Sequence, residues 1–260
     1  KHWSRGLGDV YKRQLLSNGA VNDKYFSMSG GDYRFRHFLS FSSRNEEGMI
    51  IWKDKNYFDR KTVRANFDFL PLDNLSLSLN TSYSSIDAIM PPSDNHIYGL
   101  MYNTLVAYSP WQESDSTSLS QLGIKFGSKR LVASANVKYY PFKNNYSFGL
   151  NTVQLNAKFG IDDVERKNSN LFPSGYNYAL FNGGFKALVN SNETNTIFDF
   201  GASHNYNFGG VNTTTSFSAQ FYDHLWDGVE ISRDSFGQNA VTDIGSVSYT
   251  HLRAHETSAY

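Results

Sequence analysis

Alternation of apolar and polar residues between Thr62 and Tyr83 constrains the fold of this chain more than any other feature. Every second residue is apolar in Thr62–Leu70, and the pattern resumes in Leu75–Tyr83. Successive side chains of a strand point to opposite faces, so each segment predicts a strand with one apolar and one polar face. Pro71-Leu72-Asp73-Asn74, between them, contains the residue types that reverse a chain tightly. The stretch therefore predicts a β-hairpin.

The polar face of this hairpin separates two classes of all-β protein. It carries mostly Ser and Asn, whereas soluble sheets usually cover their wet face with Lys, Glu and Arg. Strands of about nine to eleven residues also have the length that a tilted strand needs to cross a bilayer. Both features favour a membrane barrel. We therefore expect Phe67 and Leu77 to face lipid, and Asn66 and Ser78 to face the lumen.

The same alternation recurs along the chain and gives about seven regular strands. The further segments are Tyr33–Ser42, Leu131–Tyr139, Tyr146–Ile161 with a bulge near Asn151-Thr152, Phe198–Phe208 and Val211–Phe221. Long connections at 44–61, 84–130 and 161–195 alternate with short turns at 71–74, 141–145 and 209–210. A short extra strand is predicted around Phe185–Val189, inside the third long connection. In an antiparallel sheet this order places all long loops on one rim, as in outer-membrane barrels.

Composition excludes several kinds of partner and site. The chain has 24 Lys+Arg and 24 Asp+Glu, and this neutral balance argues against a nucleic-acid partner. Cysteine is absent from the sequence, which removes disulfides, thiolate metal sites and cysteine nucleophiles. No run of about eighteen apolar residues occurs, so the sequence excludes a transmembrane helix. A mean hydropathy of -0.48 is compatible with a barrel, because barrel hydrophobicity is spread over alternate positions.

The two ends of the sequence differ from the rest. Lys1–Gln14 and Val247–Tyr260 resemble translated sequencing-adapter tails, so we set both aside as non-native. Residues 15–246 are then expected to form part of a single barrel domain. On this interpretation the natural start and stop are both missing, and a signal peptide would not be visible.

Several short motifs, taken in order, resemble one family of barrels. They are Gly30–Ser42 leading to Glu47-Gly48, the run Arg64–Phe69, the run Asn80–Ser84 and, more loosely, Ser203–Phe208 with Gly209-Gly210. Together they resemble the barrel of SusC/RagA-type TonB-dependent outer-membrane transporters of Bacteroidetes-like bacteria, over about residues 22–244. The chain departs from that family by lacking a plug, a TonB-contacting segment and a closing strand, so it would leave two bare edges.

This resemblance implies a function, a location and a set of partners. The implied fold is an antiparallel transmembrane β-barrel of the large plugged class, in the outer membrane of a Gram-negative bacterium. The implied activity is uptake of a nutrient oligomer, either glycan or peptide. The implied partners are outer-membrane lipid, a SusD-like surface lipoprotein and, through the missing N-terminal part, TonB.

Clusters of titratable residues carry weaker signals. His251, His255 and Glu256 have the helical spacing of zinc ligands but lie in the C-terminal tail. Asp223, His224 and Asp227 could form a metal or acid–base cluster, yet charged residues also commonly end barrel strands.

An acidic pair and two histidines complete the candidates. Asp162-Asp163 with Glu165 could act as paired carboxylates, but the adjacent Arg166-Lys167 favours a solvated loop tip. His37 and His204 lie on the apolar phase and are interpreted as interfacial or locally satisfied. Phosphate-loop and nucleophile-elbow motifs are absent from the sequence. We therefore assign no catalytic, cofactor or metal residue and expect no enzyme.

The segment 84–130 is too rich in aromatic and aliphatic residues for a linker. We expect it to be an extracellular loop that contacts a ligand or partner through Tyr98, Tyr102, Tyr108 and Trp111. Tyr and Trp offer flat apolar faces with a polar handle, which suits stacking on sugars. The alternative is that these side chains only fold the loop onto the barrel mouth.

Three function classes stay open. The first is a transporter fragment; the second is an all-β glycan-binding or glycan-hydrolysing domain; the third is a passive porin or adhesin barrel. Anomalous migration on unboiled gels separates barrels from the second class. A neighbouring gene for a SusD-like lipoprotein separates a transporter from a porin.

Overall fold

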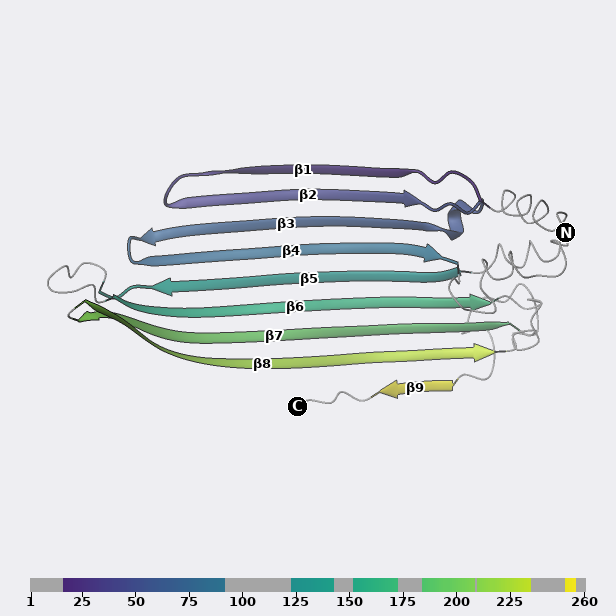
Figure 1. Ribbon diagram of the computed structural model, residues 1–260. Coiled ribbons are helices and arrows are strands. Elements are labelled where there is room, and N and C mark those ends of the chain that lie inside the picture. Colours follow the sequence, from purple (N-terminus) through teal and green to yellow (C-terminus); the bar gives the residue numbers. More distant parts are fainter. Residues whose placement is uncertain are drawn as a thin grey trace, which may run out of the picture.

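The described part of the chain is almost entirely β-strand. The computed structural model describes residues 16–91, 123–142, 152–172, 184–208 and 210–234, together with the backbone of 251–255. They form one antiparallel sheet of nine strands in sequence order, each hydrogen-bonded to the next (Figure 1). The strands are β1 (Val21–Gly31), β2 (Phe35–Glu47), β3 (Tyr57–Leu72), β4 (Leu75–Met90), β5 (Gly123–Tyr139), β6 (Thr152–Phe172), β7 (Phe185–Phe208), β8 (Val211–Asp234) and β9 (His251–His255).

Helical structure is minimal in these residues. A single 3₁₀ turn, η1 (Lys53–Lys55), precedes β3. Among the described residues, no helix is long and apolar enough to cross a membrane. The all-β class predicted from the alternation is confirmed.

Short turns join the strands at one rim, as predicted. Leu72 pairs with Leu75 across the β3–β4 turn, so Asp73-Asn74 alone reverse the chain. Phe208 pairs with Val211 across the β7–β8 turn, where Gly210 has φ 84°. That positive φ favours glycine, which has no Cβ to clash.

The turn between β1 and β2 is closed by a side chain. Asp32 Oδ1 accepts hydrogen bonds from the backbone N–H groups of Arg34 (2.8 Å) and Phe35 (2.9 Å). The two donors stabilise the carboxylate and lower the pKa of Asp32, Phe35 contributing most.

The connections alternate between two opposite ends of the sheet (Figure 1). Residues 32–34, 73–74, 140–151 and 209–210 connect strands at one rim. Residues 48–56, 91–122, 173–184 and 235–250 connect them at the other. The predicted placement of long loops on the rim opposite the short turns is confirmed for the turns at 73–74 and 209–210. The turn predicted at 141–145 lies largely outside the described residues. The predicted bulge near Asn151-Thr152 falls at the edge of a segment, 143–151, outside the described residues.

The strands are longer than the hydropathy pattern predicts. The expected loops 44–61, 84–130 and 161–195 are wrong at both ends, because β2, β4 and β6 continue to Glu47, Met90 and Phe172. The following strands likewise begin early, and the short strand expected around Phe185–Val189 is the start of β7. In these extensions polar and charged residues occupy both faces, so alternation of hydropathy stops while backbone pairing continues.

Two strands were not expected. β1, which pairs with β2 along its whole length, lies in a segment where alternation predicts no strand. β9 lies in the C-terminal stretch set aside as non-native, and its backbone pairs with Gly228–Ser232 of β8. A non-native tail is expected to make no stable contact with the strands, and this expectation is wrong for these five residues. An unpaired edge accepts an extended segment through backbone groups, whatever its side chains.

The sheet is a single layer, and its apolar side chains have little protein to pack against. Few apolar side chains in the described residues are buried: Ile50, Ala88, Val164, Phe172 and Ala187. Phe217 and Phe221, by contrast, are 65% and 66% exposed. β1 and β9 form the two edges and are not paired with each other, so the sheet is open. Large exposed apolar patches mark the faces of a protein that contact a partner or a membrane.

Candidate functional site

Cross-strand register divides the sheet into an apolar face and a polar face. Directly paired residues share a face, and Phe67 pairs with Leu79 as Phe69 pairs with Leu77. Asn66 pairs with Asn80 on the opposite side, as Asp68 pairs with Ser78. The predicted grouping of Phe67 with Leu77, and of Asn66 with Ser78, is therefore confirmed as a division between faces. Which face lies against lipid stays a prediction.

The apolar face carries a band that ends at a row of lysines. Along β3 the band runs from Phe69 to Val63, a height of about 20 Å at the usual rise per residue. Transmembrane barrels have an apolar band of about 25 Å. The next row toward the long connections joins Lys24, Ser43, Lys61, Ser85 and Lys129 across five strands.

Arginine and lysine are segregated between the two faces. In β1–β8, six of the seven arginines belong to the polar face: Arg36, Arg44, Arg60, Arg64, Arg130 and Arg166. Most lysines belong to the other face: Lys24, Lys61, Lys125, Lys129, Lys167 and Lys186. Lysine has a flexible stem that suits an interface with lipid, whereas the planar guanidinium suits bidentate recognition of carboxylates. The polar face is therefore the candidate functional site.

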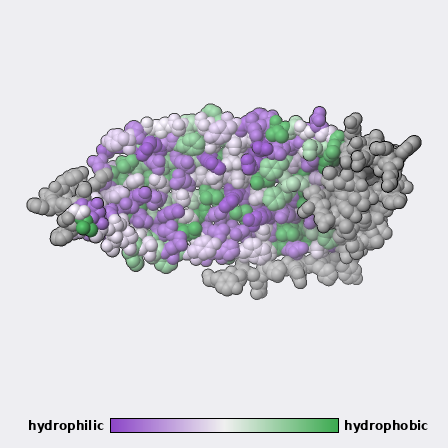
Figure 2. All heavy atoms as spheres, viewed as in Figure 1, coloured by the Kyte–Doolittle hydropathy of each residue, from purple (hydrophilic) through white to green (hydrophobic). Residues whose placement is uncertain are grey.

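Figure 2 shows the sheet from a side on which hydrophilic residues predominate and hydrophobic ones are scattered in small groups. This distribution is the one that register assigns to the polar face. Some apolar members of that face, such as Phe38 and Val132, have serine and arginine as their same-face neighbours along the strand.

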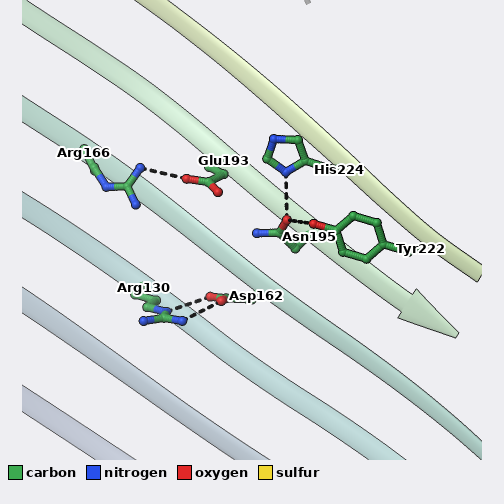
Figure 3. A network of polar contacts seen from close by, with 7 residues as sticks. All are labelled: Arg130, Asp162, Arg166, Glu193, Asn195, Tyr222 and His224. Carbon is green, nitrogen blue, oxygen red and sulfur yellow. Dashed lines mark hydrogen bonds and ion pairs between the residues drawn. The ribbon is translucent and has the colours of Figure 1, made fainter. Parts of the chain in front are cut away.

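On the β5–β8 half of the polar face, the arginines are paired with acids (Figure 3). Arg130 binds Asp162 in a bidentate manner, with Nε–Oδ1 and Nη2–Oδ2 distances of 2.8 and 2.6 Å. Arg166 donates to Glu193 Oε2 at 2.9 Å. These contacts join neighbouring strands and neutralise the charge locally.

A hydrogen-bonded group without an arginine continues this network to β8 (Figure 3). Asn195 Oδ1 accepts the hydroxyl of Tyr222 at 2.6 Å and lies 2.8 Å from His224 Nδ1. All three residues belong to the polar face of β7 and β8.

On the β2–β4 half, the polar face is hollowed and carries uncompensated charge. A hollow of about 630 Å³ lies over β1–β5 and is lined by Tyr25, Phe38, Ser40, Ser42, Arg60, Thr62, Arg64, Ser82, Ser84, Ile86, Arg130 and Val132. None of these described lining residues is acidic. Within the ranges that the structure describes, Arg60 and Arg64 have no ion-pair or hydrogen-bond partner. The hollow is therefore electropositive.

The acidic run in β6 is not a loop tip. Asp162, Asp163 and Glu165 lie in the middle of that strand. Asp163 accepts a hydrogen bond from Thr194, and Glu165 forms ion pairs with Lys129 and Lys167 on the apolar-face side of the sheet. Asp162 belongs to the opposite face from the other two, so the three carboxylates do not converge.

The second candidate cluster is also dispersed. Asp223, His224 and Asp227 lie in β8, where register places both aspartates on one face and His224 on the other. Within the described residues no group of three or more metal-ligating side chains is gathered. His251 and His255 lie in β9, so their spacing is that of a strand and not of a helix; Glu256 lies outside the described residues.

His37 and His204 share the apolar face, as expected from their phase. The His37 ring stacks on Phe35 with a centroid distance of 5.7 Å, but its Nδ1 is buried without a hydrogen-bond partner in the described structure. The expectation that His37 is locally satisfied is therefore wrong for that atom. His204 lies 6.0 Å from the ring of Tyr206.

The structure describes the arginine hollow but not the expected ligand loop. Tyr98, Tyr102, Tyr108 and Trp111 fall outside the described residues, so their role stays a prediction. Arg60, Arg64 and Arg130 were not selected from the sequence, because two of them fell inside expected loops. The four-residue spacing of Arg60 and Arg64 on one face could have revealed the pair once β3 was known to begin at Tyr57.

Comparisons with known proteins concern the fold. No family model and no curated protein matches the chain. Among solved structures, the RagAB peptide importer in its "closed-closed" state aligns with a TM-score of 0.72, and a RagAB peptide transporter aligns with 0.69. The chain has a barrel-like fold. Each alignment covers 96% of this chain and 30% of the other chain, at 14% sequence identity. The likeness therefore shows shared architecture with transporter chains, and the chain spans less than a third of their length.

Proposed function

We propose that this chain forms part of the wall of a SusC/RagA-type TonB-dependent outer-membrane transporter that imports nutrient oligomers. The observation that carries the proposal is the two-faced sheet itself: an apolar band on one face and a polar, arginine-bearing face on the other. An outward apolar band and a polar interior are the defining features of transmembrane barrels. The alignment with peptide importer chains supports transport in preference to enzymatic or adhesive functions.

The open edges support a position within a larger barrel. Among the described residues, β1 has an unpaired side, and β8 is unpaired on its outer side except at Gly228–Ser232. Lipid supplies no hydrogen bonds for such backbone groups. We infer that further strands, outside this sequence, close the barrel. A plug and a TonB-contacting segment then belong to the part of the protein that this sequence does not contain.

The proposed partners follow from the same comparison. The RagAB structures are those of a peptide importer. By analogy we propose a SusD-like surface lipoprotein at the rim with the long connections, and a peptide or glycan as cargo. The segment 91–122 joins β4 to β5 at that rim. We propose that Tyr98, Tyr102, Tyr108 and Trp111, which belong to this segment, contact such a partner.

Recovery of the longer reading frame tests this proposal first. We also propose that residues 1–14 and 247–260 are adapter-derived, so the genomic reading frame should diverge from this sequence at both ends. The complete protein should insert into outer membranes, migrate faster on gels when unboiled, and support energy-dependent uptake of peptide or glycan. Assembly with uptake that does not depend on energy would indicate a passive porin, and no heat-dependent shift would contradict a barrel.

A further inference from the structure

The hollow on the polar face has the composition of a binding site for carboxylates. We propose that Arg60 and Arg64 bind the acidic side chains of an extended oligopeptide, and that Arg130, which is paired with Asp162, borders the same site. The proposal deepens the transport function and rests on it, because it places the hollow on the lumen side of a barrel wall. A volume of about 630 Å³ lies within the usual range for ligand pockets.

The three arginines surround a floor of hydroxyl groups. Arg60 and Arg64 lie four residues apart on the polar face of β3, about 14 Å between their Cα atoms at the rise of a strand. Arg130 reaches the same patch from β5, since it pairs with Ser84, which pairs with Thr62 midway between the two other arginines. The guanidinium groups therefore frame the hydroxyls of Thr62 and Ser84.

The charge of this patch is not cancelled by the chain. Arg44, the neighbour of Arg60 on β2, is already paired with Asp23 and Glu46. Arg130 is committed to Asp162, whereas Arg60 and Arg64 have no acidic partner among the described residues. A guanidinium offers two parallel N–H donors that match a carboxylate, and such charge-assisted bonds are stronger than neutral ones.

The spacing favours a peptide over other anions. An extended peptide rises by the same distance per residue as β3, so carboxylates four residues apart match Arg60 and Arg64. Its backbone N–H and C=O groups can bond the hydroxyls of Ser82, Ser84 and Thr62, which both donate and accept. Tyr25 and Phe38 add apolar surface at the edge of the hollow.

The test compares the binding of two peptides to wild type and to arginine variants. The probes are Glu-Ala-Glu-Ala-Glu and its uncharged analogue Gln-Ala-Gln-Ala-Gln, titrated calorimetrically into the complete transporter in detergent. The proteins are wild type, the double variant R60Q/R64Q and the matched control R166Q, which changes a polar-face arginine outside the hollow. Heat-modifiability confirms that each protein is assembled.

The expected result is selective loss of acidic-peptide binding. Wild type and R166Q should bind the Glu peptide at least about tenfold more tightly than the Gln peptide, and R60Q/R64Q should lose that preference. R60K/R64K should recover part of it, because lysine restores charge without the fork. Added salt at about 1 M should weaken the wild-type preference, since the hollow is open to solvent.

Three results would overturn the inference. They are equal affinity of wild type for both peptides, an unchanged preference in the assembled R60Q/R64Q variant, and tighter binding of a uronate oligosaccharide than of the Glu peptide. The second result would indicate that these arginines pair with acidic groups elsewhere in the complete protein. If peptide preference follows the arginines but no variant supports uptake, the binding site stands and the transport proposal fails.

Discussion

Two halves of the polar face use arginine in different ways. On the β5–β8 half, Arg130 and Arg166 are each paired with an acid on the next strand. On the β2–β4 half, Arg60 and Arg64 line the hollow together with serine and threonine side chains and form no ion pair in the described structure. The first half satisfies its own charges, whereas the second leaves charge available for another molecule. The number of arginines on a face therefore does not determine its uncompensated charge, which depends on whether each arginine has an acidic partner.

Pairing on the β5–β8 half does not imply large stability. The Arg130 and Asp162 side chains are 54% and 29% exposed, and Arg166 and Glu193 are 40% and 27% exposed. Ion pairs with this exposure typically contribute about 0–1 kcal/mol each to stability. We therefore interpret these pairs as fixing charge and register between strands.

A carboxylate introduced into the hollow should have the largest effect, because it turns the unpaired half into a paired one. S84E places an acid at the centre of the three arginines, opposite Thr62 and Arg130. Binding of the Glu peptide should fall by more than about tenfold, through competition for the guanidinium groups. S134E, on the polar face outside the hollow, is the control and should change affinity less than about twofold. Equal losses for both variants in the calorimetric titration would contradict the assignment.

The aromatic connection between β4 and β5 should contribute a smaller effect. Replacing Tyr108 and Trp111 by alanine removes apolar surface that we expect at the mouth of the barrel. Uptake or co-purification of the lipoprotein partner should fall several-fold, by about 3–10-fold, with normal assembly on unboiled gels. Wild-type uptake and partner binding in an assembled variant would exclude a role for these two residues.

Release of a paired arginine should have the smallest effect. D162N frees Arg130, so binding of the Glu peptide should tighten by about two- to threefold. E193Q frees Arg166, which lies outside the hollow, and should leave peptide affinity unchanged. The same titration distinguishes them; a gain with E193Q equal to that with D162N would show that any free arginine on this face suffices.

Part of this architecture can be predicted from sequence, because the hydropathy of each strand residue reflects the surroundings of its side chain. Where one face of a strand is apolar and the other polar, as in Thr62–Leu70, alternation identifies strand, face and turn correctly. Beyond the band, as in Asp162–Phe172, both faces are polar and the sequence resembles a loop, yet backbone pairing continues. β1 was missed for a related reason, since glycine and charged residues interrupt its alternation.

The binding site is harder to predict than the fold. Arg130 lies beside Thr62 and Ser84 only because β3, β4 and β5 pair in one particular register. β4 and β5 are distant in sequence, so that register has to be known before the site can be located. Local patterns do not contain that information. The segregation of arginine from lysine likewise becomes visible only after each residue is assigned to a face.

Site-directed spin labelling of the complete protein in lipid vesicles tests the central claim, that the two faces of the sheet meet different media. Labels at Phe67 and Leu77 belong to the apolar face, and labels at Asn66 and Ser78 belong to the polar face. We expect high accessibility to lipid-dissolved oxygen only at Phe67 and Leu77. High accessibility to a water-soluble nickel complex is expected only at Asn66 and Ser78. The opposite pattern, or equal oxygen accessibility at all four positions, would contradict it.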